Sequence, residues 1–379
     1  MRDRAMTDET LLLHADSESD PDLRWATGFV VPDPVFWFRA RGRSHLVVNA
    51  LELGRARRQA RVDRVVDSGA VRKRLVRRGV ESPTTLDVLV AILRERRVRS
   101  VTVPERFPLA TADHLRKHGV RVHVKPGLFF PERAVKRRDE VAAIRRAQAA
   151  AEAGVAKALD LLRRARARGG LLVEGGEKVT SERLRHVCEA EFLRHGCVGQ
   201  HTIVASGDQC VDPHDVGSGP VRAGATVIFD VFPREVATGY FADMSRTVVR
   251  GRASKEVRGL YDMVLRGQQF AFDRVRAGAN GGEIHEGIRK LFADAGYRTG
   301  PRNGRMEGFF HGTGHSLGLA IHEPPGIGAR DETLPAGAVV TVEPGLYYTG
   351  IGGVRLEDMV LVTKTGCVNL TKFPKVLEI

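Results

Sequence analysis

The sequence predicts an α/β protein of two domains, at residues 1–131 and 132–379. Three observations lead to this fold class. The first 130 residues alternate short β-branched runs with amphipathic helical segments, which is typical of a layered α/β domain. A cluster of proline and glycine at residues 126–131 interrupts that pattern. Beyond residue 200, short β-branched strands alternate with glycine and proline turns, and 379 residues suffice for two cores.

In the N-terminal half, the spacing of apolar residues defines the expected elements. Residues 84–95 (TTLDVLVAILRE) repeat apolar side chains at helical spacing, and residues 51–65 are expected to form a second, basic helix. The expected strands are the apolar, β-branched runs at residues 30–39, 43–49, 100–103 and 120–124.

The C-terminal half begins with helices and continues mainly as strands. An alanine- and arginine-rich stretch at residues 136–164 has helical periodicity, and Thr180 is expected to cap a helix at residues 181–195. One more helix is expected at residues 254–276. The expected strands follow the runs HTIVASG, ATVIFDVF, GYFADMSRTVV, AVVTVEPG and GGVRLEDMVLVT.

Composition indicates a globular cytoplasmic protein. The chain is 42% apolar and 28% charged, and no apolar run approaches the ~20 residues that a membrane-spanning helix needs. Leu11–Leu13 is too short for the apolar region of a secretion signal. The four cysteines form no CxxC pair, so we expect reduced thiols rather than a disulfide framework or a zinc-thiolate site.

The basic charge of the chain raises the question of a polyanionic partner. The formal net charge is +14, and arginine-rich runs occur at residues 55–64, 72–78 and 94–99. These runs contain apolar residues at helical spacing and no interleaved aromatic side chains, which favours solvated helix faces. A nucleic-acid partner is therefore not expected, although the basic N-terminal half leaves that alternative open.

Carboxylates occur in the C-terminal strands at positions where a buried sheet would be apolar. They are Asp230, Asp243, Glu343 and Glu357. Any one of them alone fits a turn cap or a strand end. Because buried carboxylates are costly unless they are paired or bound to metal, four of them in one sheet need a shared cationic partner.

Three histidines lie close together in the sequence, at His311, His315 and His322. The spacing of the first two resembles the HExxH zinc helix, but position 312 is glycine instead of glutamate, and several further glycines disfavour a helix. A structural role fits one histidine better than three. We therefore expect a loop and strand that place imidazoles over a cavity.

Arg355 is expected to lie beside Glu357, because side chains two residues apart on a strand share a face. A guanidinium in that position can orient a metal-binding carboxylate or hold an anionic group of a substrate. The alternative is a plain ion pair without a part in catalysis.

These segments resemble the pita-bread metallopeptidases, and among them the Xaa-Pro aminopeptidase and prolidase branch. The resemblance covers residues 132–379, and Leu23–Phe29 is similar to the N-terminal domain of creatinase-type members. It implies a creatinase-type α/β domain followed by a pita-bread catalytic domain. It rests on the segments around Asp230 and Asp243, His311–His322, Glu343-Pro344-Gly345 and Gly353–Asp358.

The resemblance also implies two divalent metal ions. Asp230 would bind one ion, His315 and Glu343 would bind the other, and Asp243 and Glu357 would bridge them. Mn²⁺ is the expected ion, because an oxygen-rich shell with one imidazole suits it, and Co²⁺, Fe²⁺ and Zn²⁺ are the alternatives.

In the reaction that the resemblance implies, a metal-bridged hydroxide attacks the peptide carbonyl. Glu343 would accept the proton and His322 would stabilise the oxyanion. His214 and Arg355 complete the expected catalytic group, and His214, His311, His322 and Arg355 are the side chains expected to face the substrate. For His214 a structural role is the alternative.

The expected function is that of a homodimeric aminopeptidase that hydrolyses the N-terminal Xaa-Pro bond of a peptide. The alternatives are an Xaa-Pro dipeptidase (prolidase), a creatinase-like hydrolase without metal, and a non-catalytic pita-bread protein that binds a partner. Asp230 and Asp243 lie further apart than is usual in the family, and Phe232 stands where glycine is usual. Because both changes lie beside the metals, they leave the choice of substrate open.

Overall fold

The computed structural model of the chain describes residues 9–302 and 304–379. The described chain divides into two compact units. The first unit ends at Arg133 and the second runs from Ala134 to Ile379. Each unit has its own sheets, helices and hydrophobic core.

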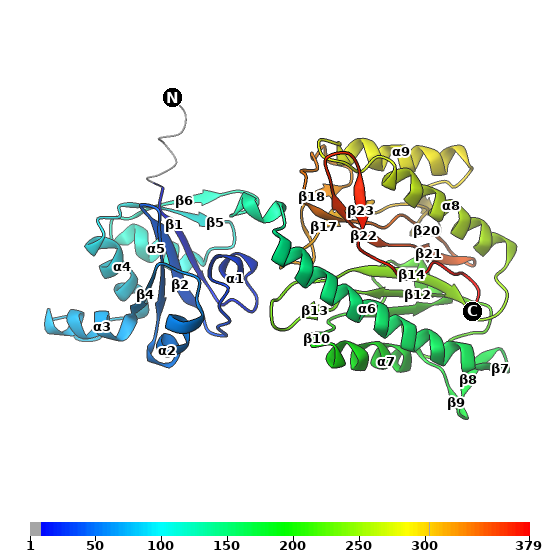
Figure 1. The fold of residues 1–379 in the computed structure, drawn as a ribbon, viewed down its shortest axis with the longest axis horizontal. Helices are drawn as coiled ribbons and strands as arrows, with labels where there is room; N and C mark the ends of the chain where they lie inside the picture. Colours follow the sequence, from blue (N-terminus) through cyan, green and yellow to red (C-terminus); the bar gives the residue numbers. More distant parts are fainter. Residues whose placement is uncertain (1–8, 303) are drawn as a thin grey trace. The chain divides into compact units, whose positions relative to one another are not determined.

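The first unit is built on a mixed sheet with the strand order β4-β3-β2-β1-β5-β6 (Figure 1). Strands β1, β2 and β3 pair antiparallel, whereas β4, β5 and β6 join the sheet in parallel. The strands are β1 (Leu11–Ala15), β2 (Val35–Ala40), β3 (Arg43–Val48), β4 (Arg64–Asp67), β5 (Ser100–Pro104) and β6 (Arg121–Lys125). The helices are α1 (Pro21–Thr27), α2 (Ala50–Gln59), α3 (Ser68–Arg77), α4 (Thr85–Glu95) and α5 (Leu109–Lys117).

Side chains of this sheet alternate between its two faces and form a core on each. Leu12 packs on one face with Leu115 of α5. Leu13 and Trp37 pack on the other face with Leu23 of α1. Helices therefore cover both faces of the sheet, as expected for a layered α/β unit.

The helix expected at residues 51–65 is wrong at its C-terminal end. Helix α2 begins after the side-chain cap Asn49 and ends at Gln59. Residues 64–67 form β4 instead, because their backbone pairs in parallel with β3. Pairing with a distant strand thus overrides the local helical pattern.

The strand expected at residues 30–39 is wrong at its N-terminal end. Strand β2 begins only at Val35. Pro32 and Pro34 lack the N–H group that a sheet ladder requires, which accounts for the late start. The helix face expected at residues 72–78 is part of α3, whereas the sequence patterns do not predict α1, α5 or β1.

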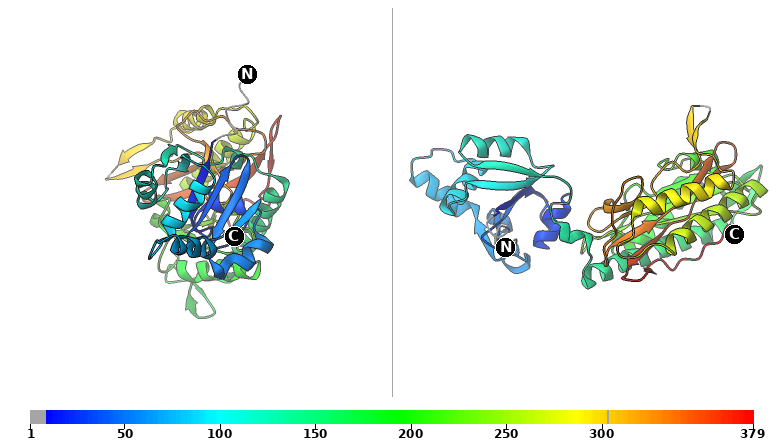
Figure 2. Two further views of the ribbon diagram at one scale, coloured as in Figure 1. Left: turned by 90° about the vertical axis from the view of Figure 1, so that its left-hand side faces the viewer. Right: turned by 90° about the horizontal axis from the view of Figure 1, so that it is seen from above.

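The second unit places strands between two pairs of helices (Figures 1 and 2). Helices α6 and α7 share a core with β12 and β14 on one side, and α8 and α9 share a core with β19 and β22 on the other. The main sheets have the strand orders β11-β12-β14 and β18-β17-β19-β22-β23. The helices are α6 (Arg138–Arg164), α7 (Ser181–Arg194), α8 (Lys255–Phe272) and α9 (Gly281–Asp294), with the 3₁₀ turn η3 (Gly207–Val211). The 3₁₀ turn η2 (Pro131–Ala134) spans the boundary between the two units.

The strands of the second unit are short and are joined by tight turns. Figure 2 shows one hairpin, β15–β16, projecting from this unit. The strands are β7 (Arg166–Arg168), β8 (Leu171–Glu174), β9 (Glu177–Lys178), β10 (Cys197–Val198), β11 (Ile203–Ser206), β12 (Thr226–Val231), β13 (Arg234–Glu235), β14 (Met244–Val249), β15 (Gly300–Arg302), β16 (Arg305–Glu307), β17 (Gly314–Ser316), β18 (Glu323–Ile327), β19 (Val339–Val342), β20 (Gly345–Tyr348), β21 (Gly352–Arg355), β22 (Asp358–Val362) and β23 (Cys367–Asn369).

This unit differs from the expectations at several places. The strand expected from GYFADMSRTVV begins only at Met244, and the helix expected at residues 254–276 ends at Phe272. The sequence patterns do not predict α9, which follows the side-chain cap Asn280 and begins with two glycines. The single strand expected from GGVRLEDMVLVT is two strands, because β21 pairs with β20 and β22 pairs with β19. Leu356 and Glu357 lie between them. The expected helices at residues 136–164 and 181–195 are present as α6 and α7, and Thr180 caps α7 as expected.

Two further features of the described residues concern the cysteines and the length of the helices. Each of the four cysteines, all within the described residues, is a free thiol. Among the helices of residues 9–302 and 304–379, none combines the length and apolar character needed to cross a bilayer.

Candidate metal centre

The side chains that the sequence singles out for chemistry line one cavity in the second unit. The cavity has a volume of about 740 Å³. Ile203, Val216, Phe232, Phe310 and Ile321 form apolar parts of its wall. The expected site residues on the same wall are His214, Asp230, Asp243, His311, His315, His322, Glu343, Arg355 and Glu357.

The carboxylates of this cavity come from the ends of two ladders, which corrects the expectation of a single sheet. Asp230 lies in β12 opposite Ser245 of β14, and Asp243 directly precedes β14. Glu343 directly follows β19 and Glu357 directly precedes β22, which is the antiparallel partner of β19. Because both ladders end at the cavity, the side chains at their ends meet there.

His315 lies in β17 and faces the carboxylates. Its Nε2 atom is 3.6 Å from Oδ2 of Asp243 and 3.4 Å from Oε1 of Glu343. Its Nδ1–H donates to the carbonyl of Ser316 at 3.1 Å, which leaves the Nε2 lone pair directed at the carboxylates. One donor atom each from Asp243, His315 and Glu357 lie within 4.8 Å of one another.

The strand that carries His315 approaches its neighbour closely at Gly314. A Cβ atom at this position would lie 2.0 Å from the carbonyl oxygen of Thr341 on β19, so only glycine fits. The hydroxyl of Thr341 in turn accepts a hydrogen bond from the backbone N–H of His315 at 3.0 Å. This glycine therefore sets the distance between the imidazole and the ladder that ends at Glu343.

Arg355 pairs with Asp230, and not with Glu357 as expected from strand periodicity. Its Nη2 atom is 2.6 Å from Oδ2 of Asp230, and its Nε–H donates to the Ser245 hydroxyl at 3.0 Å. That hydroxyl lies 3.0 Å from Asp230 and 2.8 Å from Oε2 of Glu357. Arg355 and Ser245 thus fix the orientation of two carboxylates.

His311 is engaged inside the protein through both ring nitrogens. Its Nδ1–H donates to the carbonyl of Gly312 at 2.7 Å, and its Nε2 atom accepts from the Tyr347 hydroxyl at 2.8 Å. Tyr347 also accepts a hydrogen bond from Arg355 at 3.1 Å. Burial, reinforced by the charge of Arg355, lowers the pKa of His311 to about 3, so its imidazole is neutral.

His322 and His214 occupy more open positions on the cavity wall. Both side chains are exposed. The ring of His322 lies at 4.3 Å from that of His315, measured between ring centroids. Partial desolvation by the cavity wall, and then the neighbouring His315, lower the pKa of His322, which favours the neutral imidazole. These two histidines are therefore placed to meet a molecule that enters the cavity.

The charge of the cluster fits divalent cations. Burial, followed by repulsion from neighbouring carboxylates, raises the pKa of Asp243 and Glu357 well above the usual range. Burial also raises the pKa of Glu343 to about 7, although Arg355 opposes the shift. Among the described residues, buried Oε1 of Glu357 has no hydrogen-bond partner. Bound cations would neutralise these charges and give that oxygen a ligand role.

Sequence reasoning missed two side chains of this site, Ser245 and Tyr347. Ser245 joins Asp230, Glu357 and Arg355, and Tyr347 joins His311 to Arg355. Both are buried polar groups on strands next to the carboxylates. The sequence signal that could have identified them is a polar residue at an inward-facing position of an otherwise apolar strand.

We expect the stability of the metal-free protein to fall as pH rises through about 4.5 to 7. Glu343 has a raised pKa of about 7 against an ordinary 4.5, so between these values the folded state binds more protons than the unfolded state. Mn²⁺ at a hundred times its Kd should add about 2.7 kcal/mol at pH 8 and much less at pH 5, where protons compete for the carboxylates.

Thermal unfolding of the chelator-treated chain, with and without Mn²⁺ at both pH values, measures this effect. KCl at matched ionic strength is the control for general screening. Equal Mn²⁺ effects at pH 5 and pH 8 would contradict the prediction.

The residues that line the cavity lie within a segment that matches a known protein family. Residues 142–364, more than half of the chain, match the model of metallopeptidase family M24. An Xaa-Pro dipeptidase of Pyrococcus furiosus is 37% identical over 173 residues, which make up 45% of this chain and 47% of that protein. The matched region thus spans about half the length of that relative.

Solved structures cover nearly the whole chain. An Xaa-Pro dipeptidase from Bacillus anthracis matches 98% of this chain and 95% of its own, with a TM-score of 0.82 and 25% identity. An X-Pro aminopeptidase from Thermotoga maritima matches 98% of each chain, with a TM-score of 0.80 and 23% identity, a likeness that concerns the fold. The expected α/β fold with a pita-bread unit is confirmed.

Proposed function

This chain belongs to metallopeptidase family M24, and we propose that it is a metal-dependent Xaa-Pro dipeptidase of the prolidase type. The observation that carries the proposal is the convergence of Asp230, Asp243, His315, Glu343 and Glu357 on one cavity. The names of the Pyrococcus and Bacillus relatives favour the dipeptidase over the aminopeptidase expected from the sequence.

The proposed metal ligands are the five side chains just named. Asp243 and Glu357 would be shared between two ions, Asp230 would complete one site, and His315 and Glu343 the other. When bound, such ions activate water and polarise a peptide carbonyl. We propose Mn²⁺ as the ion, because four carboxylates and one imidazole form a largely hard donor set.

The other site residues then act on the substrate or on the ligands. Glu343 is the proposed proton carrier, as the family resemblance implies, because its carboxylate lines the cavity beside the other proposed ligands. The neutral imidazole of His322 would donate a hydrogen bond to the substrate carbonyl, and His214 would hold the substrate at the mouth of the cavity. Arg355 and His311 form hydrogen bonds to Asp230 and Tyr347, respectively, and would hold these two side chains in position.

The size and lining of the cavity suit a small peptide. A volume of about 740 Å³ lies within the ~300–1,000 Å³ range of small-molecule sites. Phe232, Phe310 and Ile321 supply apolar surface on which a prolyl ring can pack. Phe232, at the position where the family usually has glycine, is therefore a proposed determinant of substrate choice.

We also propose the organisation of the protein as expected from the sequence. Residues 1–131 would form the creatinase-type domain and residues 132–379 the catalytic domain, in a cytoplasmic homodimer. Light scattering coupled to size-exclusion chromatography tests the dimer. Metal analysis of the purified protein tests for two ions and their identity.

A direct test of the function compares peptides of different length. The purified full chain, stripped by a chelator and reloaded with Mn²⁺, is expected to hydrolyse Xaa-Pro dipeptides at least about tenfold faster than Xaa-Pro-Xaa tripeptides. The physical reason is that a dipeptidase also binds the carboxylate at the substrate's C-terminus, which tripeptides place elsewhere. Dipeptides without proline serve as the control, and liquid chromatography of the products gives the rates.

Each alternative predicts a different outcome of this test. Preferred cleavage of the longer peptides would instead support the aminopeptidase function. Full activity after exhaustive chelation would indicate a creatinase-like hydrolase. Tight, salt-sensitive binding of nucleic acid without peptidase activity would indicate a binding protein.

A further inference from the structure

A second group of metal-ligand side chains lies in the first unit, apart from the cavity described above. It consists of Asp87 in α4, His114 in α5, and His118, which directly follows α5. One donor atom from each lies within 4.8 Å of the other two. All three residues are partly accessible to solvent, although the Nε2 atom of His114 is itself buried.

The two histidines are arranged as a ligand pair. They are four residues apart, so they lie on one face of the helix one turn apart, and their ring centroids are separated by 4.3 Å. Nδ1 of His118 is 2.8 Å from the carbonyl of His114. Because a carbonyl only accepts, Nδ1 carries the proton and Nε2 keeps a free lone pair. Metal-binding histidines use this same backbone contact to fix their tautomer.

Asp87 is held in place by the start of its helix. Its Oδ2 atom accepts from the backbone N–H and the hydroxyl of Thr84, at 2.8 and 2.6 Å. These bonds also lower the pKa of Asp87, so it is a carboxylate at neutral pH. Its second oxygen, Oδ1, lies 3.2 Å from Nε2 of His114. One oxygen is thus fixed by the cap while the other faces the imidazole.

The contact between Asp87 and His114 has the dimensions of two ligands on one ion. Donor atoms about 2.0–2.1 Å from a tetrahedral Zn²⁺ are about 3.3 Å apart. The buried Nε2 atom of His114 has no hydrogen bond within residues 9–302 and 304–379, because the contact with Asp87, although short, lacks hydrogen-bond geometry. An ion between the two atoms would satisfy both.

We propose that Asp87, His114 and His118 form a mononuclear site for Zn²⁺ in the first unit, independent of the catalytic metals. Two imidazoles and one carboxylate favour Zn²⁺, Cu²⁺ or Ni²⁺ over Mn²⁺, and water would complete the tetrahedron. The neighbouring charges are Arg94, which donates to the carbonyl of His118, and Asp113, which pairs with Arg116. The bound ion would link α4 to α5.

Zn²⁺ stoichiometry of the full-length chain tests the proposal. After chelation and equilibrium dialysis against Zn²⁺, His118→Gln is expected to lose one equivalent per chain relative to wild type and to keep wild-type peptidase activity. The matched control is His123→Gln, which removes an exposed imidazole of β6 in the same unit and should lose none. An equal stoichiometry in wild type and His118→Gln would overturn the proposal.

Two further variants distinguish loss of metal at this site from a folding defect and from loss of metal at the catalytic centre. Asp87→Asn keeps an oxygen that can cap the helix start and is also expected to lose one equivalent. Glu357→Gln with Asp243→Asn removes proposed catalytic ligands. In that background, Cu²⁺ should still give an electron paramagnetic resonance spectrum with hyperfine splitting from two imidazole nitrogens. Absence of that splitting, or its persistence after His118→Gln is added, would contradict the proposal.

Discussion

Replacing Glu357 with glutamine is expected to lower metal-dependent peptidase activity about a thousandfold or more. The proposed bridging role makes Glu357 a ligand to both ions, whose contribution to catalysis is several kcal/mol, and each 1.36 kcal/mol corresponds to a factor of ten in rate. Glutamine has the same shape and keeps an oxygen for the Ser245 hydroxyl, which lies 2.8 Å from Oε2. The rate with an Xaa-Pro dipeptide and the number of bound ions are the measurements.

The same variant separates a metal-binding role from a structural one. Burial raises the pKa of Glu357 well above its usual range, so a neutral amide should leave the metal-free protein as stable as wild type or more so. Added Mn²⁺ should then raise its unfolding temperature less than that of wild type. Asp243→Asn is expected to behave alike.

A matched control is Glu286→Gln, which removes an exposed carboxylate that pairs with Arg289 on α9. It should leave activity and metal content unchanged. Wild-type turnover by Glu357→Gln would contradict the proposed bridging role. A large loss of metal-free stability would instead indicate that Glu357 acts mainly in folding.

The sequence predicts helices where local signals agree and misses them where packing overrides propensity. Helix α4 carries its full signature, since Thr84 and Asp87 form the capping box. Helix α9 begins with Gly281 and Gly282, which disfavour a helix in isolation. A Cβ atom at Gly281 would lie 2.2 Å from the carbonyl oxygen of Gly326, so the glycine serves tertiary packing. No local pattern contains that information.

For the candidate site, the sequence indicated which residue types are involved but not which side chains contact one another. The unusual carboxylates and histidines were visible in the sequence, because polar residues interrupt apolar strands there. The pairing of Arg355 with Asp230, 125 residues away, was not, since it depends on β21 and β12 meeting in space. Strand periodicity suggested Glu357 as the partner, but the run breaks between β21 and β22 at that residue.

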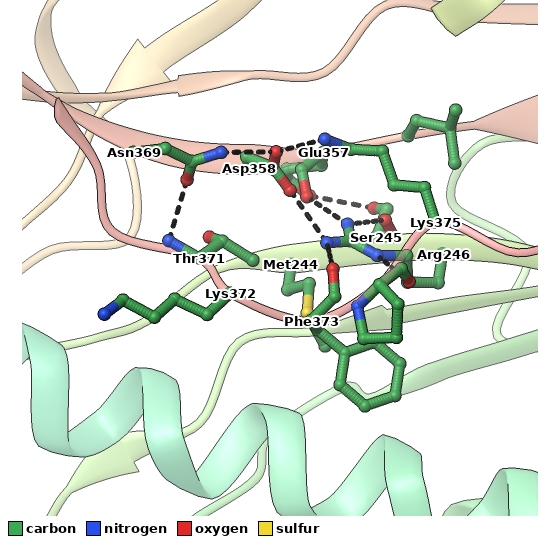
Figure 3. Close-up of polar contacts among 12 residues, drawn as sticks. Met244, Ser245, Arg246, Glu357, Asp358, Asn369, Thr371, Lys372, Phe373 and Lys375 are labelled. Atoms are coloured by element: carbon green, nitrogen blue, oxygen red, sulfur yellow. Dashed lines mark hydrogen bonds and ion pairs between the residues drawn. The ribbon is translucent and has the colours of Figure 1, made fainter. Parts of the chain in front are cut away.

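A large loss of folding stability is expected when Arg246, which follows Ser245 in β14, is replaced. Its side chain is 2% exposed, and its five N–H donors meet five acceptors within 2.6–3.2 Å (Figure 3). The acceptors are the carbonyls of Ser245, Glu357, Phe373 and Pro374 and the carboxylate of Asp358. Arg246 therefore ties the segment after β23 to the residues that carry the candidate ligands.

Arg246→Ala is expected to lower the free energy of unfolding by about 3–5 kcal/mol, measured by urea denaturation of the metal-free chain. The reason is that Asp358, which is fully buried, would lose its buried partner and keep only Lys375 and Asn369 on its other oxygen. Because the carbonyl of Glu357 also loses its donor, bound metal and activity should fall as well. Arg246→Lys keeps the charge but offers three donors instead of five, so its loss should be smaller.

Lys375 also pairs with Asp358, so comparing Lys375→Ala with Arg246→Ala tests why the arginine variant loses stability. Its ammonium lies 2.5 Å from the same Asp358 carboxylate, but the Lys375 side chain is 21% exposed, so Lys375→Ala should cost about 1 kcal/mol or less. If the loss of a charge partner for the Asp358 carboxylate accounts for the cost of Arg246→Ala, adding Asp358→Asn in that background should recover part of the lost stability. Equal losses in Arg246→Ala and Lys375→Ala, or no recovery in the double variant, would mean that the carbonyl contacts, and not the charge pair, hold this segment in place.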